Sequence, residues 1–164
     1  MKTKIIICLL VVMSSLSLNA QTPYKHSIGG IVGFMEGGSY KTFISDVFAI
    51  QVDFGLHFSH YSLGINVNVN GNFMYEQAIK NGFYWFAGGG LSVGPTFGAN
   101  PFSNNPVGFR LGLNGIGGAE YKFAKIPLTL QADVRPGVAF YIWGGGFYPR
   151  FDYSLLNASA RYTF

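Results

Sequence analysis

The segment "HFSH" holds the side chains with the clearest potential for chemistry. His57 and Ser59 are two positions apart, so on a β-strand they share one face, and a histidine beside a serine can activate its hydroxyl as a nucleophile. Glu76 is the acid that could complete such a site. The three histidines outside the first twenty residues form no trio with an acid at the spacing of a metal site. Whether hydrolysis is possible therefore depends on where this face points.

Three glycine runs, "GGIVG", "AGGG" and "NGIGG", invite comparison with phosphate-binding loops. Such a loop follows a strand and opens a helix. Each run here lies instead within a strand pattern, where glycine permits curvature and close packing. We therefore expect no nucleotide and no other cofactor.

The composition favours a β-protein. The 164 residues include 23 Gly, 16 Phe and 10 Tyr. Glycine weakens helices, and aromatic residues are frequent in strands. The glycines lack the period of collagen, and the chain is too apolar for a disordered protein.

The first twenty residues have the pattern of a secretory signal peptide. A basic "MKTK" precedes the apolar "IIICLLVVM", and small residues precede an expected cut after Ala20. The single Cys8 lies inside this segment, so a mature chain has no disulfide or thiolate metal site. Loss of Lys2 and Lys4 lowers the formal net charge from +4 to +2, too little to indicate nucleic acid. We expect one exported domain at 21–164.

Strict alternation of apolar and polar residues marks the strands. In "VFAIQVDFGLHFS" the even positions are apolar and the odd positions are polar or small. In "LGINVNVNGNFMYEQ" four asparagines share the face opposite the apolar residues, which no helix allows. "EGG" is expected to join the first two strands, and one alternation is expected throughout the last. The eight segments cover about 25–35, 39–45, 47–59, 63–77, 83–94, 109–123, 128–141 and 151–164.

The connections differ in length. Those at 45–47 and 123–127 are tight, whereas 95–105 and 143–150 are longer and rich in Gly, Pro and Asn. In an eight-stranded antiparallel barrel these longer connections lie opposite the termini, as the outer loops of transmembrane barrels do. Loops 95–105 and 143–150 are therefore expected to carry any contact with the outside.

Side-chain volume indicates which face points outward. The interior of an eight-stranded barrel is narrow, and the many rings of the apolar face would overfill it, whereas the Gly, Ser, Asn, Gln and Thr of the other face fit. We therefore predict an all-β, eight-stranded antiparallel up-and-down transmembrane β-barrel with its apolar face toward lipid. Four acids and four bases then point inward and are expected to pair as a structural network. They are Asp53, Glu76, Arg110, Glu120, Lys122, Asp133, Arg135 and Arg161.

Four segments carry a resemblance to a known family: "SYKTFISDVFAI", "FYWFAGGG", "NGIGGAEYKFAKIPLTLQADVRPG" and "ARYTF". In them the chain resembles the small eight-stranded outer-membrane β-barrel proteins of Bacteroidetes-type bacteria. The likeness implies location in a Gram-negative outer membrane, contact with its lipid, and insertion by the barrel-assembly machinery. It implies no settled activity. We expect a monomer.

The end of the chain resembles the signal that the assembly machinery reads. An aromatic last residue follows apolar residues at alternating positions. In this sequence the pattern falls on Phe164, Tyr162 and Ala160, preceded by Ala158.

The best-supported hypothesis is a barrel with a side-chain-filled lumen and a structural or surface-interaction role through its outer loops, its ligand unspecified. One alternative is a lipid-modifying enzyme, because outer-membrane deacylases resemble "HFSH" in using a His-x-Ser pair with a distant Glu. Alternation directs His57 and Ser59 into the lumen, away from lipid, so no catalytic residue is assigned. Two further alternatives are a narrow solute or ion pathway and, with the faces reversed, a lipocalin-like soluble carrier.

Overall fold

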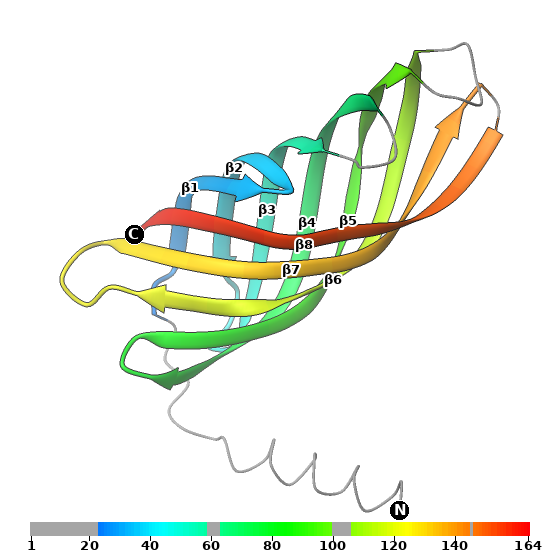
Figure 1. The fold of residues 1–164 in the computed structure, drawn as a ribbon. Helices are drawn as coiled ribbons and strands as arrows, with labels where there is room; N and C mark the ends of the chain where they lie inside the picture. Colours follow the sequence, from blue (N-terminus) through cyan, green and yellow to red (C-terminus); the bar gives the residue numbers. More distant parts are fainter. Residues whose placement is uncertain (1–22, 59–62, 100–105, 145) are drawn as a thin grey trace, which may run out of the picture.

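The fold is a closed barrel of antiparallel strands (Figure 1). The computed structural model describes residues 23–58, 63–99, 106–144 and 146–164. Each strand pairs with its neighbours in the chain, and the first also pairs with the last, so the predicted all-β, eight-stranded barrel is confirmed. No helix in the described ranges is long and apolar enough to span a membrane. The strands are β1 (His26–Gly33), β2 (Met35–Phe43), β3 (Phe48–Phe58), β4 (Leu63–Lys80), β5 (Phe83–Ala99), β6 (Val107–Lys122), β7 (Leu128–Trp143) and β8 (Gly146–Thr163).

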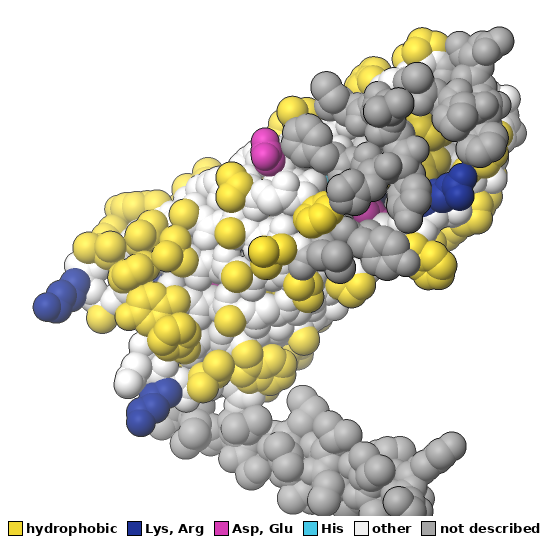
Figure 2. All heavy atoms as spheres, in the orientation of Figure 1, with side chains coloured by type: hydrophobic (Ala, Val, Ile, Leu, Met, Phe, Trp, Pro, Cys, Tyr) yellow, Lys and Arg dark blue, Asp and Glu magenta, His cyan; other side chains and the backbone are white. Residues whose placement is uncertain are grey.

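The alternation in the sequence sets the two faces of the barrel. Where β3 pairs with β4, the partners Asp53 and Asn70 are buried inside, while the next partners, Phe54 and Val69, are exposed outside. Phe54 is 59% exposed and Asp53 is 0% exposed. Figure 2 shows hydrophobic side chains over much of the outer wall, with the visible Lys and Arg toward its ends. The barrel is thus apolar outside and polar inside.

The strands differ greatly in length. β1 to β3 have 8, 9 and 11 residues, whereas β4 to β8 have 16 to 18. A strand of about 9–11 residues is enough to cross a bilayer. On the side away from the termini, the long strands continue past the short ones (Figure 1). We call this part the outer extension; it comprises 94–99, 107–111, 140–143 and 146–149.

Three expected connections are wrong. Residues 95–99 belong to β5 and 146–150 belong to β8, so strand replaces the start of the first predicted loop and most of the second, while 100–105 and 145 lie outside the described residues. "EGG" lies within β2, and the chain turns before it, where Gly33 has a φ of 129°. A Cβ at Gly37 would approach the carbonyl oxygen of Phe54 to 2.1 Å, so this glycine permits close strand contact and does not mark a turn. The tight connections near 45–47 and 123–127 are confirmed.

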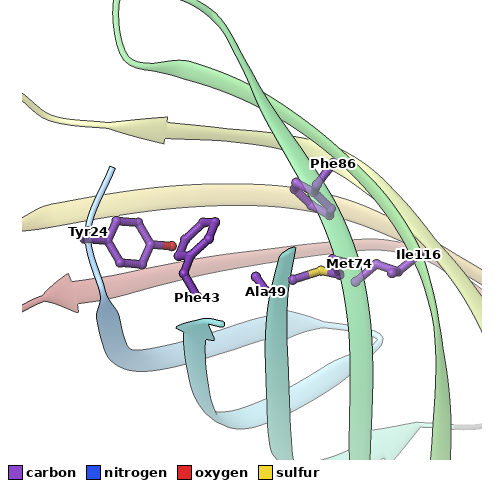
Figure 3. Packing of buried hydrophobic residues seen from close by; sticks show 6 residues of the cluster. All are labelled: Tyr24, Phe43, Ala49, Met74, Phe86 and Ile116. Atoms are coloured by element: carbon purple, nitrogen blue, oxygen red, sulfur yellow. The ribbon is translucent and has the colours of Figure 1, made fainter. Parts of the chain in front are cut away.

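The two ends of the barrel domain meet at one rim. His26 and Phe164 exchange two backbone hydrogen bonds of 2.9 Å. We call this end of the barrel, where the two ends of the domain meet, the inner rim. Near it the lumen contains a small apolar cluster (Figure 3). Its members are Tyr24, Phe43, Ala49, Met74, Phe86 and Ile116. The expected signal peptide lies outside the described residues.

Candidate functional site

The lumen is the candidate site, because it collects most of the polar side chains of the barrel. Seven of the eight predicted network residues are at most 4% exposed. These seven are Asp53, Glu76, Arg110, Glu120, Asp133, Arg135 and Arg161. Lys122 lies apart from the ion pairs, since its Nζ donates to the carbonyl oxygens of Phe123 and Ile126 in the turn after β6.

An inner cluster of two cations and two carboxylates closes the end of the lumen near the termini. Lys41 Nζ is 2.9 Å from Glu120 Oε2 and also binds Glu76. Arg161 Nη2 lies 2.8 Å from the same Glu120 oxygen. Each charge is therefore opposed by another, which offsets the cost of removing it from water.

Aromatic rings surround Lys41 in the inner cluster. Its Nζ lies 5.0 Å from the ring centre of Phe43, 5.5 Å from Phe86 and 5.8 Å from Tyr24. Tyr24 precedes β1, packs edge-on against Phe43 and donates its hydroxyl to Glu120 Oε1 at 2.7 Å. From the segment before the first strand, the Tyr24 side chain thus points toward Phe43 at this end of the lumen (Figure 3).

A central cluster bridges the barrel at mid-height. Arg135 on β7 lies 2.6 Å from Asp53 on β3 and 2.6 Å from the neighbouring Asp133. Gln131 on β7 donates to Gln51 on β3 at 3.2 Å. Strands β3 and β7 are four apart in the closed barrel, so both bonds cross the lumen.

Three asparagines form a closed ring of amide hydrogen bonds beside Arg135. Asn72 donates to Asn70, Asn70 donates to Asn114 at 2.8 Å, and Asn114 donates back to Asn72 at 2.9 Å. Asn70 Oδ1 also accepts from Arg135 at 3.0 Å. Asn70 and Asn72 of β4 thus find amide partners inside the barrel, together with Asn114 of β6.

An outer cluster lies at the opposite end of the lumen. Arg110 binds Asp152, and its Nη1 donates to Ser92 Oγ at 2.9 Å. His57 Nε2 lies 3.3 Å from the other oxygen of Asp152. The lining of a cavity here includes these four side chains and Asn68, and it reaches Asn70 and Arg135 of the lumen centre.

The structure does not assemble the hydrolytic site considered from the sequence. His57 pairs in register with Asn66, whereas Glu76 lies ten positions further along β4, roughly 33 Å away at strand spacing. Ser59 lies outside the described residues. Ser92 reaches Asp152 through Arg110 and not through His57, so the outer cluster lacks the Ser–His–Asp order of a catalytic triad.

Three members of these clusters were not predicted from the sequence: Lys41, Asp152 and Tyr24. Lys41 lies inward between Ser39 and Phe43, and the alternation of β2 could have revealed it. The single alternation expected for the last strand does not direct Asp152 inward, because β8 gains an extra residue between the register pairs Arg135–Ser154 and Asp133–Asn157. This bulge reverses the faces, so Phe151 points outward with 67% exposure. Nothing in the local sequence marks Tyr24 as part of the lumen.

Among the residues that the structure describes, no three His, Cys, Asp or Glu side chains could hold a metal ion. Comparison with protein-family models, with curated proteins and with solved structures found no match. The chemistry of the lumen and the outer wall must therefore carry the functional argument.

Proposed function

We propose that this protein is an outer-membrane β-barrel with a closed lumen, which anchors its outer extension at the cell surface for a structural or surface-interaction role. The observation that carries the proposal is the inverted distribution of side chains. Large apolar residues stand outward, such as Leu91 at 64% exposure, while Lys41, Asp53 and Arg161 are 0% exposed inside. Transmembrane barrels have this arrangement, whereas soluble barrels have the reverse.

The aromatic residues of the outer wall support a membrane position. Phe83 and Tyr121 lie 4.6 Å apart between ring centres, and Tyr121 and Phe123 lie 4.8 Å apart, at the ends of β5 and β6 near the termini. Tyr162 and Phe164 stand outward on the same rim with 56% and 61% exposure. Such rings form the interfacial girdles of membrane barrels.

Cross-lumen contacts argue against the solute or ion pathway. The Lys41–Glu120 bond joins β2 to β6, and the Asp53–Arg135 bond joins β3 to β7, so each spans strands on opposite sides. Side chains thereby occupy the axis, as expected of an eight-stranded barrel. The separation of Glu76 from His57 likewise argues against the hydrolase, and we propose no enzymatic activity.

The unequal strands support a role at the surface. β4 to β8 are longer than a bilayer requires, so the outer extension projects beyond the bilayer. The part of the barrel with the filled lumen supports the extension from within the membrane. The extension has two connections in place of the two long loops expected from the sequence: 100–106 and 144–145.

A charge placed on the outer wall tests the proposal. In a soluble barrel, Leu91→Lys puts a lysine in water and changes stability by less than about 0.5 kcal/mol. In a lipid-facing wall it costs about 2–4 kcal/mol near the midplane. We expect Leu91→Lys, but not the control Leu91→Ile, to reduce the outer-membrane fraction and the heat-dependent shift on a gel. Equal amounts of both variants in a soluble fraction would contradict the proposal.

A further inference from the structure

An open groove of about 440 Å³ lies in the outer wall of the barrel, on β4 and β5. Gly71 and Gly89 belong to its floor, and Phe73 and Leu91 stand beside them. Gly89 lies near the middle of the part of β5 below the outer extension. The groove is therefore at mid-height of the wall that we place in lipid, and the anchoring role gives no reason for it.

Nothing within the barrel requires glycine at the outward positions around this groove. A Cβ at Gly71 would meet nothing within 4 Å, and at Gly89 and Gly115 its nearest atoms would lie 3.5 and 3.9 Å away, which are ordinary contacts. None of the three has a positive φ, and the register of β5 with β6 has no shift. The adjacent Gly88 differs, because its Cβ would lie 2.1 Å from a carbonyl oxygen. Glycine in a strand without such a reason indicates the approach of another backbone or a ligand from outside.

Side-chain size changes across these strands so that a ridge lies beside a hollow. Gly89 pairs with Phe73 on β4 and with Gly115 on β6. Ala87, the next outward residue of β5, pairs with Gly117 on β6. Phe73 is 51% exposed and forms the ridge on the β4 side. Ala87, Gly115 and Gly117 form the hollow on the β6 side.

This arrangement is complementary to itself. Two copies inserted in the same direction in one membrane are related by a twofold axis along the bilayer normal, and such an axis brings the same surface patch of both copies together. The left and right sides of the patch are then exchanged between the copies. An axis near Gly89 therefore places Phe73 of each copy opposite the hollow of the other.

In lipid, the shape of this patch matters more than its apolar character. Apolar side chains lose no water on leaving lipid, so association depends on close packing, and small residues let two backbones approach. The exposed large side chains around the groove present roughly 500 Å² per copy, with about 150–200 Å² for each in full. They are 38–64% exposed and comprise Ile50, Val69, Phe73, Leu91, Val93 and Leu113. Two copies would bury about 1,000 Å², the lower limit of a specific contact, so the association should be reversible.

We propose that this wall is the contact of a dimer, with the Gly89 backbones at the twofold axis and Phe73 of each copy in the hollow of the other. The dimer replaces the monomer expected from the sequence. It rests on the proposed membrane position, because a shared bilayer holds both copies in one orientation. The membrane fraction and the heat-dependent gel shift report insertion separately, so failure of the dimer and failure of the membrane position are distinct results.

Cysteine cross-linking in phosphatidylcholine vesicles tests the contact. The only cysteine, Cys8, lies in the expected signal peptide, so the chain 21–164 has none. Gly89→Cys places a thiol at the twofold axis, and a disulfide requires Cα atoms within about 7 Å. We expect oxidation by copper phenanthroline to give a disulfide-linked dimer. The control Gly38→Cys faces outward on β2, where a Cβ would have its nearest neighbour at 4.0 Å, and should remain uncross-linked.

Filling the hollow should separate the copies without disturbing the barrel. Gly115→Leu puts a side chain where Phe73 of the other copy would lie, so in the Gly89→Cys background it should lower the cross-linked fraction about tenfold. The matched control Gly38→Leu adds the same side chain to β2 and should leave that fraction unchanged. Phe73→Ala removes the ridge and should lower the fraction as Gly115→Leu does.

The heat-dependent gel shift shows which variants are folded. If Gly115→Leu does not fold, Phe73→Ala decides. Inserted Gly89→Cys that gives no dimer would overturn the proposal and leave the groove to lipid acyl chains. Equal cross-linking of Gly89→Cys and Gly38→Cys would indicate random collision and overturn it as well. Undiminished cross-linking after a folded hollow-filling or ridge-removing change would have the same meaning.

Discussion

Asp53 and Arg135 meet across the full width of the barrel, with Oδ2 and Nη1 2.6 Å apart. Asp53 comes from β3 and Arg135 from β7, and both side chains are at most 5% exposed. Within the described residues, Arg135 is also the only cation that forms an ion pair with Asp133. One guanidinium thus holds two carboxylates at the centre of the lumen.

Removal of this guanidinium should destabilise the barrel strongly. Arg135→Met leaves two buried carboxylates without their cation, which costs about 3–5 kcal/mol. The change in the free energy of unfolding is measured by urea titration in detergent, with the heat-dependent gel shift as the readout of the folded fraction. Adding Asp53→Asn and Asp133→Asn should recover part of the loss, because no buried charge then remains alone. A single variant as stable as the exposed control Lys125→Ala would contradict the role of this cluster.

The hydroxyl of Tyr24 should stabilise the inner mouth. Tyr24→Phe keeps the ring against Phe43 but loses the 2.7 Å hydrogen bond to Glu120. Hydrogen bonds to charged groups contribute about 1.5–3 kcal/mol, so the free energy of unfolding should fall by that amount. Phe43→Tyr adds a hydroxyl to the same cluster and serves as a control for altered polarity. An unchanged urea midpoint of unfolding for Tyr24→Phe would show that the segment before β1 does not close the lumen.

Two glycines on neighbouring strands should respond in opposite ways to the same methyl group. A Cβ at Gly88 would lie 2.1 Å from the carbonyl oxygen of Phe73, whereas a Cβ at Gly71 would meet nothing within 4 Å. Gly88→Ala should therefore impair assembly, while Gly71→Ala should preserve it and gain up to about 1 kcal/mol. The folded fraction after refolding into detergent distinguishes them. Equal yields from both variants would mean that the strands tolerate wider spacing.

Deletion of Phe164 should sharply reduce insertion. The residue supplies the aromatic end of the expected assembly signal, and its backbone exchanges two hydrogen bonds with His26. Phe164→Tyr keeps the ring and the backbone and should insert normally. The measurement is the amount of protein in outer-membrane fractions at equal expression. Normal insertion of the variant that lacks Phe164 would show that this residue is not part of the assembly signal.

The sequence predicted the faces of the barrel better than its contacts. Alternation placed Asp53, Glu120 and Arg161 inside because a strand has a period of two. It could not show that Arg135 meets Asp53, since the tilt of the strands decides which side chains share a level. Glycine and proline near 95–99 and 146–150 suggested loops, but neighbouring strands supply partners there. The extra residue in β8 then reversed the face of Asp152.

The seam between the first and last strands has a consequence for how the barrel forms. It runs from the His26–Phe164 pair to the Gly33–Asn157 pair, whereas β7 and β8 pair along almost their whole, greater length. Hairpins of neighbouring strands close short loops, but the seam joins the two ends of the domain and pays the largest loop entropy. We therefore expect the long hairpins to form early and the seam to close last. Pairing of β1, the shortest of the eight strands, with β8 is then the last step that converts an open sheet into a closed barrel.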